Sequence, residues 1–227
     1  MKRYRKFSIF FALIFILQLL SYTANSNLAA LTKPFVIFSL LILFYVSTRL
    51  KGRFHKRIFT GLIFALTADV LLIYAAGDES YHLYAITAIL LCLIFYTRAF
   101  YLDFQSAPEL DKNGARLAIS LCAIMAIAFY FFLRPHLDAM KLPVMICILM
   151  GSMTVMMASF RNQRVNTNSF RLILFGTICL LLSGSILAIH KFVQPIGQAA
   201  IWITASYTVA QYLITIGAAE RRLIHNG

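Results

Sequence analysis

Apolar residues form long runs that are separated by short polar connections. Runs of about 18 or more apolar residues predict helices that cross a bilayer, and we count eight in a chain of 227 residues that is 61% hydrophobic. Their expected bounds are about 7–24, 33–50, 58–76, 80–101, 115–134, 141–159, 170–189 and 196–218. The runs take up nearly the whole chain. The pattern therefore predicts an all-α protein, an eight-helix transmembrane bundle forming a single membrane domain over residues 1–227.

The positive residues lie in alternate connections between these runs. All but four of the 21 Lys and Arg residues fall at the N-terminus, in the second, fourth and sixth connections or at the C-terminus. Because cytoplasmic loops carry an excess of Lys and Arg, both termini are expected in the cytoplasm. The net charge of +13 thus indicates membrane topology, and we expect no nucleic-acid partner. The first run, basic and then apolar, is interpreted as an uncleaved signal anchor because seven more runs follow it.

One carboxylate interrupts an apolar run. Asp69 is the only one of the eight acidic residues well inside a predicted span, and the other seven lie in connections or at segment ends. A carboxylate at the middle of a membrane helix costs about 2.5–3.5 kcal/mol on insertion scales. Asp69 is therefore the main candidate for a functional residue, and we favour this over a purely structural, hydrogen-bonded acid.

Polar residues in two other spans are candidates to accompany Asp69. Lys33, next to Pro34, opens the second span; it could reach the lipid headgroups, which we favour, or point inward at an anion. In the last span, polar residues recur at three- and four-residue spacing on one face. They include Thr204, Tyr207, Thr208, Gln211 and Thr215. Such a stripe lines either a helix interface or a wet cavity, and both interpretations stay open.

The seventh span contains Ser183, Gly184 and Ser185, followed by His190 and Lys191 near its outer end. We favour a close helix crossing at Gly184 over contact with a ligand. His190 and Lys191 suit contact with a lipid phosphate as well as a simple interfacial position.

The third and seventh spans align without gaps. Gly61 matches Gly176, and Asp69 matches Gly184. A four-plus-four parallel repeat would place Asp69 and Gly184 at equal depth, facing a shared cavity. Chance similarity between apolar helices is the alternative.

The sequence does not contain the residue patterns that metal sites, Ser-His-Asp catalysis or phosphate-binding loops require. The histidines are scattered over both sides without an acid on the same helical face, so we expect no metal site. They are His55, His82, His136, His190 and His225. The four cysteines lie in predicted spans without a CxxC pair, which is typical of small buried apolar residues. No Ser-His-Asp set and no phosphate-binding glycine loop is present, and we expect no cofactor.

The connection that runs from Asp103 to Arg116 is long and mixed in charge, so we expect a solvated loop without chemistry. What remains is an intramembrane carboxyl. A carboxyl removed from water favours its protonated form and could donate a proton.

Four segments carry a resemblance to a known family. They are Lys33-Pro34, the run from Gly61 to Leu72 with Asp69-Val70-Leu71-Leu72, the run from Leu182 to Phe192, and the run from Ser206 to Ile214. Their sequence and order resemble the YhhN-like, or transmembrane protein 86, family of lysoplasmalogenases over nearly the full length of the chain.

The resemblance implies an eight-span hydrolase that cleaves the vinyl-ether bond of lysoplasmalogens to a fatty aldehyde and a glycerophospho-base. It implies a lysophospholipid substrate, membrane lipids as partners and a bacterial inner membrane as location. Asp69 would act as the catalytic acid. The candidates to line the substrate cavity are Lys33, Ser183, Ser185, His190, Lys191, Tyr207 and Gln211.

The chain departs from the family at one position. Where the family has a second aspartate between two serines, this chain has Gly184 between Ser183 and Ser185. Loss of one member of an acid–base pair commonly costs on the order of 10²–10⁴ in rate. The leading hypothesis is a hydrolase that uses Asp69; the alternatives are a lipid-binding relative without turnover and, with little support, a small transporter.

Overall fold

The computed structural model describes residues 5–24, 26–75, 80–107 and 111–224. Within these ranges the chain is helical, and its extended structure is limited to one isolated bridge between Val165 and Leu223. The α-helices are α1 Arg5–Ala24, α2 Ser26–Thr48, α3 Gly52–Tyr74, α4 Ser80–Phe104, α5 Lys112–Leu133, α6 Lys141–Ser159, α7 Thr167–Phe192 and α8 Ala199–Ala219. Two short 3-10 helices, Arg134–His136 and Asp138–Met140, join α5 to α6. The all-α prediction is confirmed.

Six helices of the described chain, α3 to α8, are long and apolar enough to cross a membrane. α1 and α2 contribute shorter apolar segments, Ser8–Ser21 and Thr32–Thr48. Large apolar side chains are exposed along the bundle, for example Ile124 and Phe131 on α5. A soluble monomer rarely exposes apolar surface on this scale, whereas contact with lipid tails explains it. The chain is thus a multi-pass membrane protein, and the count of eight spans stays a prediction.

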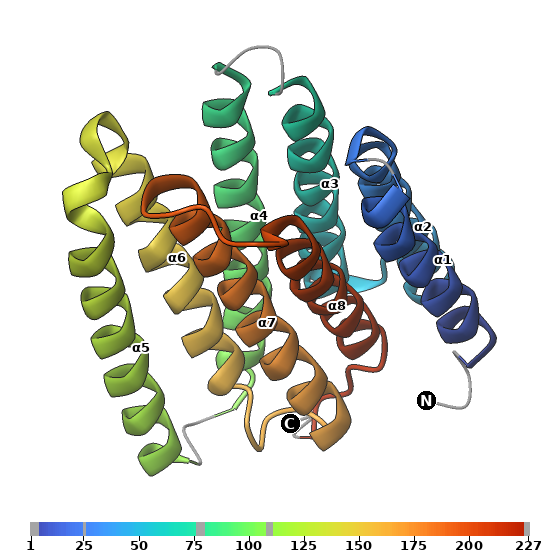
Figure 1. The fold of residues 1–227 in the computed structure, drawn as a ribbon. Helices are drawn as coiled ribbons and strands as arrows, with labels where there is room; N and C mark the ends of the chain where they lie inside the picture. The colour runs from blue at the N-terminus through green and yellow to red at the C-terminus, as the bar shows by residue number, and fades with distance from the viewer. Residues whose placement is uncertain (1–4, 25, 76–79, 108–110, 225–227) are drawn as a thin grey trace.

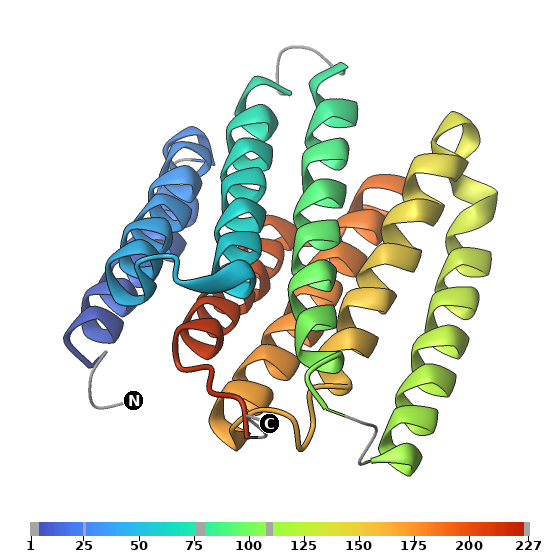
Figure 2. The same ribbon diagram turned by 180° about the vertical axis from the view of Figure 1, so that it is seen from behind.

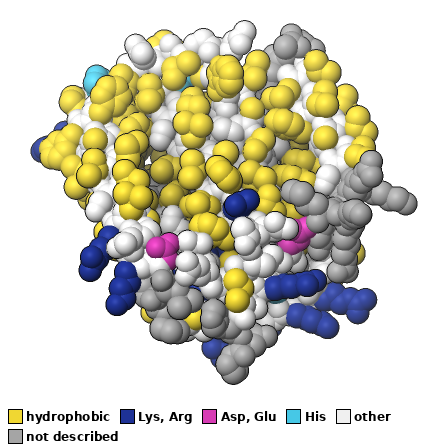
Figure 3. Space-filling model, turned by 90° about the horizontal axis from the view of Figure 1, so that it is seen from below, with side chains coloured by type: hydrophobic (Ala, Val, Ile, Leu, Met, Phe, Trp, Pro, Cys, Tyr) yellow, Lys and Arg dark blue, Asp and Glu magenta, His cyan; other side chains and the backbone are white. Residues whose placement is uncertain are grey.

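Two antiparallel helix pairs, α3 with α4 and α7 with α8, make the most extensive contacts in the bundle. α6 packs against both α4 and α7, and α5 lies outside α6. On the other flank, α1 and α2 pack against α8 and α3 (Figures 1 and 2). The Arg5 end of α1 and the Ala219 end of α8 lie at the same end of the bundle (Figure 1). Seen from that end, Lys and Arg side chains lie mainly in one half of the view and hydrophobic side chains cover much of the other (Figure 3).

Glycines permit the closest helix crossings in the two main pairs. A β-carbon on Gly61 of α3 would lie 2.6 Å from Cδ1 of Tyr96 on α4. A β-carbon on Gly176 of α7 would lie 3.1 Å from the carbonyl oxygen of Ala210 on α8. The two glycines that the internal alignment pairs therefore share a packing role. In membranes, small residues bring helices close enough for van der Waals contact along their backbones.

A buried ion cluster joins five parts of the chain at the end of α4. Asp103 is fully buried; it accepts hydrogen bonds from Nε of Arg161 at 2.8 Å and from Nε of Arg221 at 2.7 Å. The Arg161 guanidinium also donates to Oγ of Ser169 at 2.9 Å and lies 5.6 Å from the ring centroid of Phe54. The prediction of a solvated loop from Asp103 to Arg116 is thus wrong at Asp103, because two arginines distant in sequence enclose this carboxylate.

We expect Asp103→Asn to lower the stability of the protein by about 3–5 kcal/mol, because it leaves buried arginine charge without its partner. The measurement is unfolding in detergent, followed by the apparent melting temperature. Asp111→Asn is the matched control: Asp111 caps α5 by accepting from the Gly114 N–H at 2.9 Å, and asparagine caps a helix equally well. Equal melting temperatures for the two variants would contradict the assigned role of Asp103.

Candidate functional site

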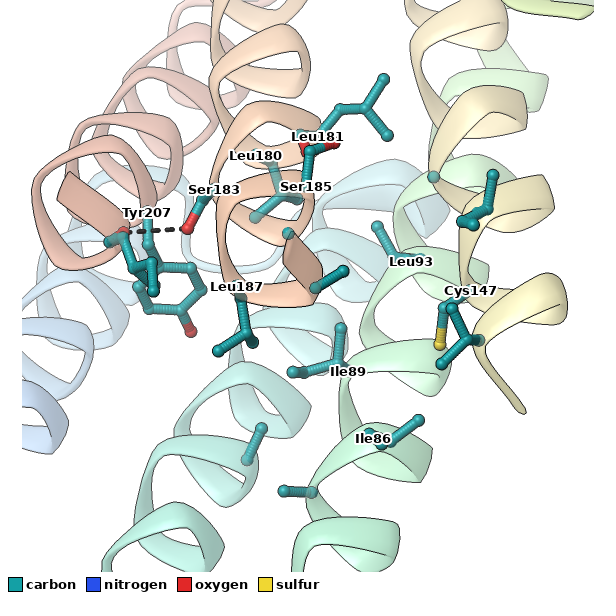
Figure 4. Close-up of a pocket in the computed structure, with 18 of the residues that line it drawn as sticks. Ile86, Ile89, Leu93, Cys147, Leu180, Leu181, Ser183, Ser185, Leu187 and Tyr207 are labelled. Carbon is teal, nitrogen blue, oxygen red and sulfur yellow. Dashed lines mark hydrogen bonds between the residues drawn. The ribbon is translucent and has the colours of Figure 1, made fainter. Parts of the chain in front are cut away.

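A cavity of about 250 Å³ lies between α3, α4, α6, α7 and α8. Aliphatic side chains make up most of its wall. Those labelled in Figure 4 include Ile86, Ile89 and Leu93 of α4 and Leu180, Leu181 and Leu187 of α7. A small number of polar side chains interrupt this apolar lining. An apolar pocket with a few convergent polar groups is typical of a site for a small molecule or lipid.

Asp69 lies on the cavity wall, in the last two turns of α3, and is 5% exposed. The hydroxyl of Tyr207, on α8, donates to its Oδ2 at 3.3 Å. The same hydroxyl lies 3.5 Å from the carbonyl oxygen of Ala65, one turn earlier on α3. Tyr207 thus fixes one carboxyl oxygen of Asp69 against the junction of α3 and α8.

Gly184 of α7 lines the same cavity as Asp69. A β-carbon placed on it would meet no neighbouring atom within 4 Å. The favoured interpretation of Gly184 as a close helix crossing is therefore wrong. No helix packs against this glycine at its β-position, and the open space there adjoins the cavity. The expectation from the internal alignment, that positions 69 and 184 face a shared cavity, agrees with the structure.

The two serines beside Gly184 are held by backbone carbonyls. Oγ of Ser183 donates to the carbonyl oxygen of Ile203 at 2.8 Å, which ties α7 to α8 (Figure 4). Oγ of Ser185 donates to the carbonyl oxygen of Leu181 at 2.9 Å, within α7. Both serines line the cavity. Neither hydroxyl is paired with a base in these bonds, so neither is arranged as an activated nucleophile.

Cationic side chains line the cavity as well. Lys33 of α2, which we expected to reach the headgroups, is on the cavity wall, and its charge acts on Asp69. Lys191, at the end of α7, lines the cavity together with Phe192. His82, near the start of α4, is a lining residue that the sequence analysis missed. The available signal was its position near the end of a predicted span, like Lys33 and Lys191 in two other spans.

The model of the YhhN family matches residues 28–218 of the chain. This range contains most of α2, all of α3 to α7 and all but the last residue of α8, and hence every residue that lines the cavity. The chain belongs to the YhhN family. No curated protein and no solved structure gives a match.

Two candidate residues of this YhhN protein lie away from the cavity. Nδ1 of His190 accepts the N–H of Ile196 at 2.9 Å, so this ring supports the connection between α7 and α8. Gln211 is fully buried, and its side-chain oxygen accepts from the hydroxyl of Tyr96 at 2.6 Å. The structure brings together Lys33, Asp69, Ser183, Ser185, Lys191 and Tyr207 on the cavity wall, and it leaves His190 and Gln211 outside.

The polar stripe on α8 has both of the roles that its pattern left open. Thr204 and Tyr207 line the cavity. Further along, Thr208 lies 3.5 Å from the side-chain oxygen of Gln18 on α1, and Gln211 connects α8 to α4. α1 of this YhhN protein, which gave no functional signal in sequence, therefore supplies a buried amide to the helix interface.

In the part of the chain that the structure describes, no three His, Cys, Asp or Glu side chains come together as metal ligands. His225 lies outside the described residues. The chemistry that the described cavity of this YhhN protein offers is that of a buried carboxyl, a phenol, hydroxyls, a thiol, an imidazole and ammonium groups.

We expect Tyr207→Phe to lower turnover of a substrate bound beside Asp69 by about tenfold, the equivalent of about 1.4 kcal/mol, because the carboxyl loses its fixed donor. The measurement is the initial rate at saturating substrate. Tyr212→Phe is the matched control, since the hydroxyl of Tyr212 donates to Ser8 of α1 at 2.6 Å, away from the cavity. Equal rates for the two variants would contradict a positioning role for Tyr207.

Proposed function

We propose that this YhhN protein is a membrane hydrolase that cleaves the vinyl-ether bond of lysoplasmalogens to a fatty aldehyde and a glycerophospho-base. The observation that carries the proposal is Asp69, a carboxyl buried on the wall of an apolar cavity within the bundle. Vinyl-ether hydrolysis needs an acid that protonates a carbon atom, and an acid shielded from water beside an apolar chain suits that step.

The proposed placement is an eight-span bundle in a bacterial inner membrane, with both termini in the cytoplasm. The concentration of Lys and Arg in every second connection between the predicted spans supports this orientation. The start of α1 and the end of α8 lie at the same end of the bundle, which supports an even number of spans. α1 and α2 would pair as the first two spans, since they pack against each other and against α8.

A lysophospholipid fits the distribution of polarity in the cavity. The aliphatic residues of α4 and α7 would hold the alkenyl chain. Lys33, Lys191 and His82 would face the phosphate of the headgroup, since a phosphate favours ammonium and imidazolium donors. The vinyl-ether bond, which joins these two parts of the lipid, would then lie beside Asp69.

In the proposed reaction, the Asp69 carboxyl gives its proton to the alkene carbon, and the ether carbon becomes part of an oxocarbenium ion. Water then adds to that carbon and loses a proton to a base. The resulting hemiacetal collapses: its hydroxyl proton returns to the Asp69 carboxylate, the carbon–oxygen bond to glycerol breaks, and the leaving oxygen takes a proton from the base. The net reaction consumes one water, and Tyr207 holds one Asp69 oxygen in place throughout.

A second candidate function is lipid binding without turnover. Gly184 favours it, since the cavity wall offers no second carboxyl among its described residues beside Asp69. Such a protein would keep saturable affinity for lysolipids and release no aldehyde.

The test is aldehyde release from a lysoplasmalogen by the purified protein in detergent. The matched substrate control is the alkyl-ether lysolipid, which has the same headgroup and chain length without the double bond and cannot form an oxocarbenium ion by protonation. Aldehyde from the vinyl ether alone would support the hydrolase. Saturable binding of both lipids without any aldehyde would overturn it in favour of the binding protein.

A further inference from the structure

Three arginines lie together where α3 begins and α4 ends. The guanidinium of Arg57 on α3 donates a hydrogen bond to the carbonyl oxygen of Arg98 on α4, and the charges of Arg98 and Arg53 act on it. Arg53 and Arg98 are exposed, and Arg57 is half-buried. None of the three lines the cavity. This arginine cluster is therefore a feature separate from the site around Asp69.

The arginine cluster has no acidic counterpart. The charges that act on Arg57 are both positive, and no carboxylate of the described chain is among them. Asp103, the acid of α4, is fully buried in its own arginine pairs. Arg53 precedes Arg57 by four residues, and like charges at this spacing destabilise a helix. Arg53 also lies in the first turn of α3, where the helix dipole disfavours positive charge. An anion from outside the chain would offset these costs.

Apolar side chains continue from the arginine cluster along the seam between α3 and α4. Phe64 of α3 stacks on Phe95 of α4 with ring centroids 5.5 Å apart, and both residues are half-buried. Phe64 follows Arg57 by seven residues, about two helical turns, so both lie on one face of α3. Ile63, beside Phe64, is 42% exposed. The seam thus has a cationic end next to an apolar surface.

The depth of the arginine cluster matches that of lipid headgroups. Arg53 and Arg57 belong to the second basic connection of the sequence and Arg98 to the fourth, and both connections are placed on the cytoplasmic side by the proposed orientation. Anionic lipids of that leaflet attract basic residues, and basic pockets between membrane helices bind their headgroups. Guanidinium groups also match the geometry of a phosphate, to which they can donate two parallel hydrogen bonds.

We propose that the arginine cluster binds the phosphate of an anionic phospholipid whose acyl chains lie along Ile63, Phe64 and Phe95. The apolar seam favours a lipid over a free phosphate, because a free phosphate would leave these side chains without a partner. The absence of an acid among the charges that act on Arg57 favours an anionic lipid over a zwitterionic one. A zwitterionic headgroup brings an ammonium group, which the cluster repels.

The test measures lipid binding and involves no turnover, so its outcome is independent of the proposed hydrolase. Purified protein in detergent is titrated with phosphatidylglycerol and, separately, with phosphatidylcholine that has the same acyl chains. Bound lipid is counted by native mass spectrometry. We expect wild type to bind phosphatidylglycerol more tightly by about fivefold or more, since basic residues at the membrane surface attract anionic headgroups.

The double variant Arg57→Gln with Arg98→Gln should lose this preference. The matched control is Arg116→Gln with Arg171→Gln, which removes the same charge from exposed arginines of α5 and α7 in connections assigned to the same side of the membrane. The control should keep the preference. Arg53→Gln serves if the double variant does not fold, because the Arg53 side chain makes no hydrogen bond within the described chain. It should lower the preference by about twofold or more.

Glycerol phosphate distinguishes a free phosphate from a lipid, because it carries the phosphate of the headgroup without acyl chains. It should not displace phosphatidylglycerol from wild type. Displacement at an equal concentration would assign the arginine cluster to a soluble phosphate and overturn the lipid site. Equal binding of the two lipids by wild type, or an unchanged preference in the folded double variant, would also overturn it. Equal losses in the double variant and its control would replace the site with a general attraction of the basic surface.

Discussion

Asp69→Asn is expected to lower aldehyde release by about 10²–10⁴-fold, the range over which a positioned general acid contributes to rate. Asparagine has nearly the same shape and keeps an oxygen that can accept from Tyr207, so the packing of α3 against α8 should persist. Its amide cannot supply the proton that the alkene carbon needs. The affinity for a lysolipid should therefore stay close to that of wild type while the rate at saturation falls.

The measurement is the initial rate of aldehyde release over a range of lysoplasmalogen concentrations, with lysolipid binding determined in parallel. Asp111→Asn makes the same chemical change at the cap of α5, outside the cavity, and should leave the rate unchanged. If Asp69→Asn keeps more than a tenth of the wild-type rate, the assignment of Asp69 as the acid is wrong. A parallel loss of binding and rate would instead indicate that Asp69 holds the cavity together.

The sequence was sufficient to predict the helices and to single out Asp69, which lies on the cavity wall. Long apolar runs report membrane helices directly, because lipid contact demands apolar side chains over about 20 residues. The helix ends were less accessible: α3 begins at Gly52, earlier than about 58, since its first turns carry Arg53, Lys56 and Arg57 and give no apolar signal. An acid inside an apolar run is visible without any structure, and the cavity wall is where Asp69 lies.

Features that depend on which helix faces which could not be predicted from the chain alone. The sequence around Asp103 predicts only the polar end of a span. Nothing near it in sequence indicates that Arg161 and Arg221 enclose its carboxylate. Glycine in a membrane helix is compatible with a close crossing, as at Gly176, and with an open cavity, as at Gly184. Gln211 has the spacing of a cavity residue, yet the position of Tyr96 on α4 makes it an interhelical contact.

Gly184→Asp is expected to raise aldehyde release by about 10²–10⁴-fold, equivalent to about 2.7–5.5 kcal/mol of barrier, because it adds a fixed carboxylate to the cavity that holds Asp69. The open space at the β-position of Gly184 means that the new side chain displaces no neighbour. Lys191, two turns further along the same face of α7, would offset part of the cost of a carboxylate in an apolar site. Two carboxyls could then divide the roles of acid and base, provided that one is protonated and the other ionised.

The gain is measured as the initial rate in the variant relative to wild type, at equal amounts of monodisperse protein. Gly197→Asp adds the same charge to the connection between α7 and α8, where there is also room for a side chain, and should leave the rate unchanged. The double variant Asp69→Asn with Gly184→Asp should lose the gain, because a base alone cannot protonate the alkene. The contrary result is a rate in Gly184→Asp at or below that of wild type, in a protein that still binds lysolipid. It would show that a carboxylate at position 184 does not lie where the reaction needs its base.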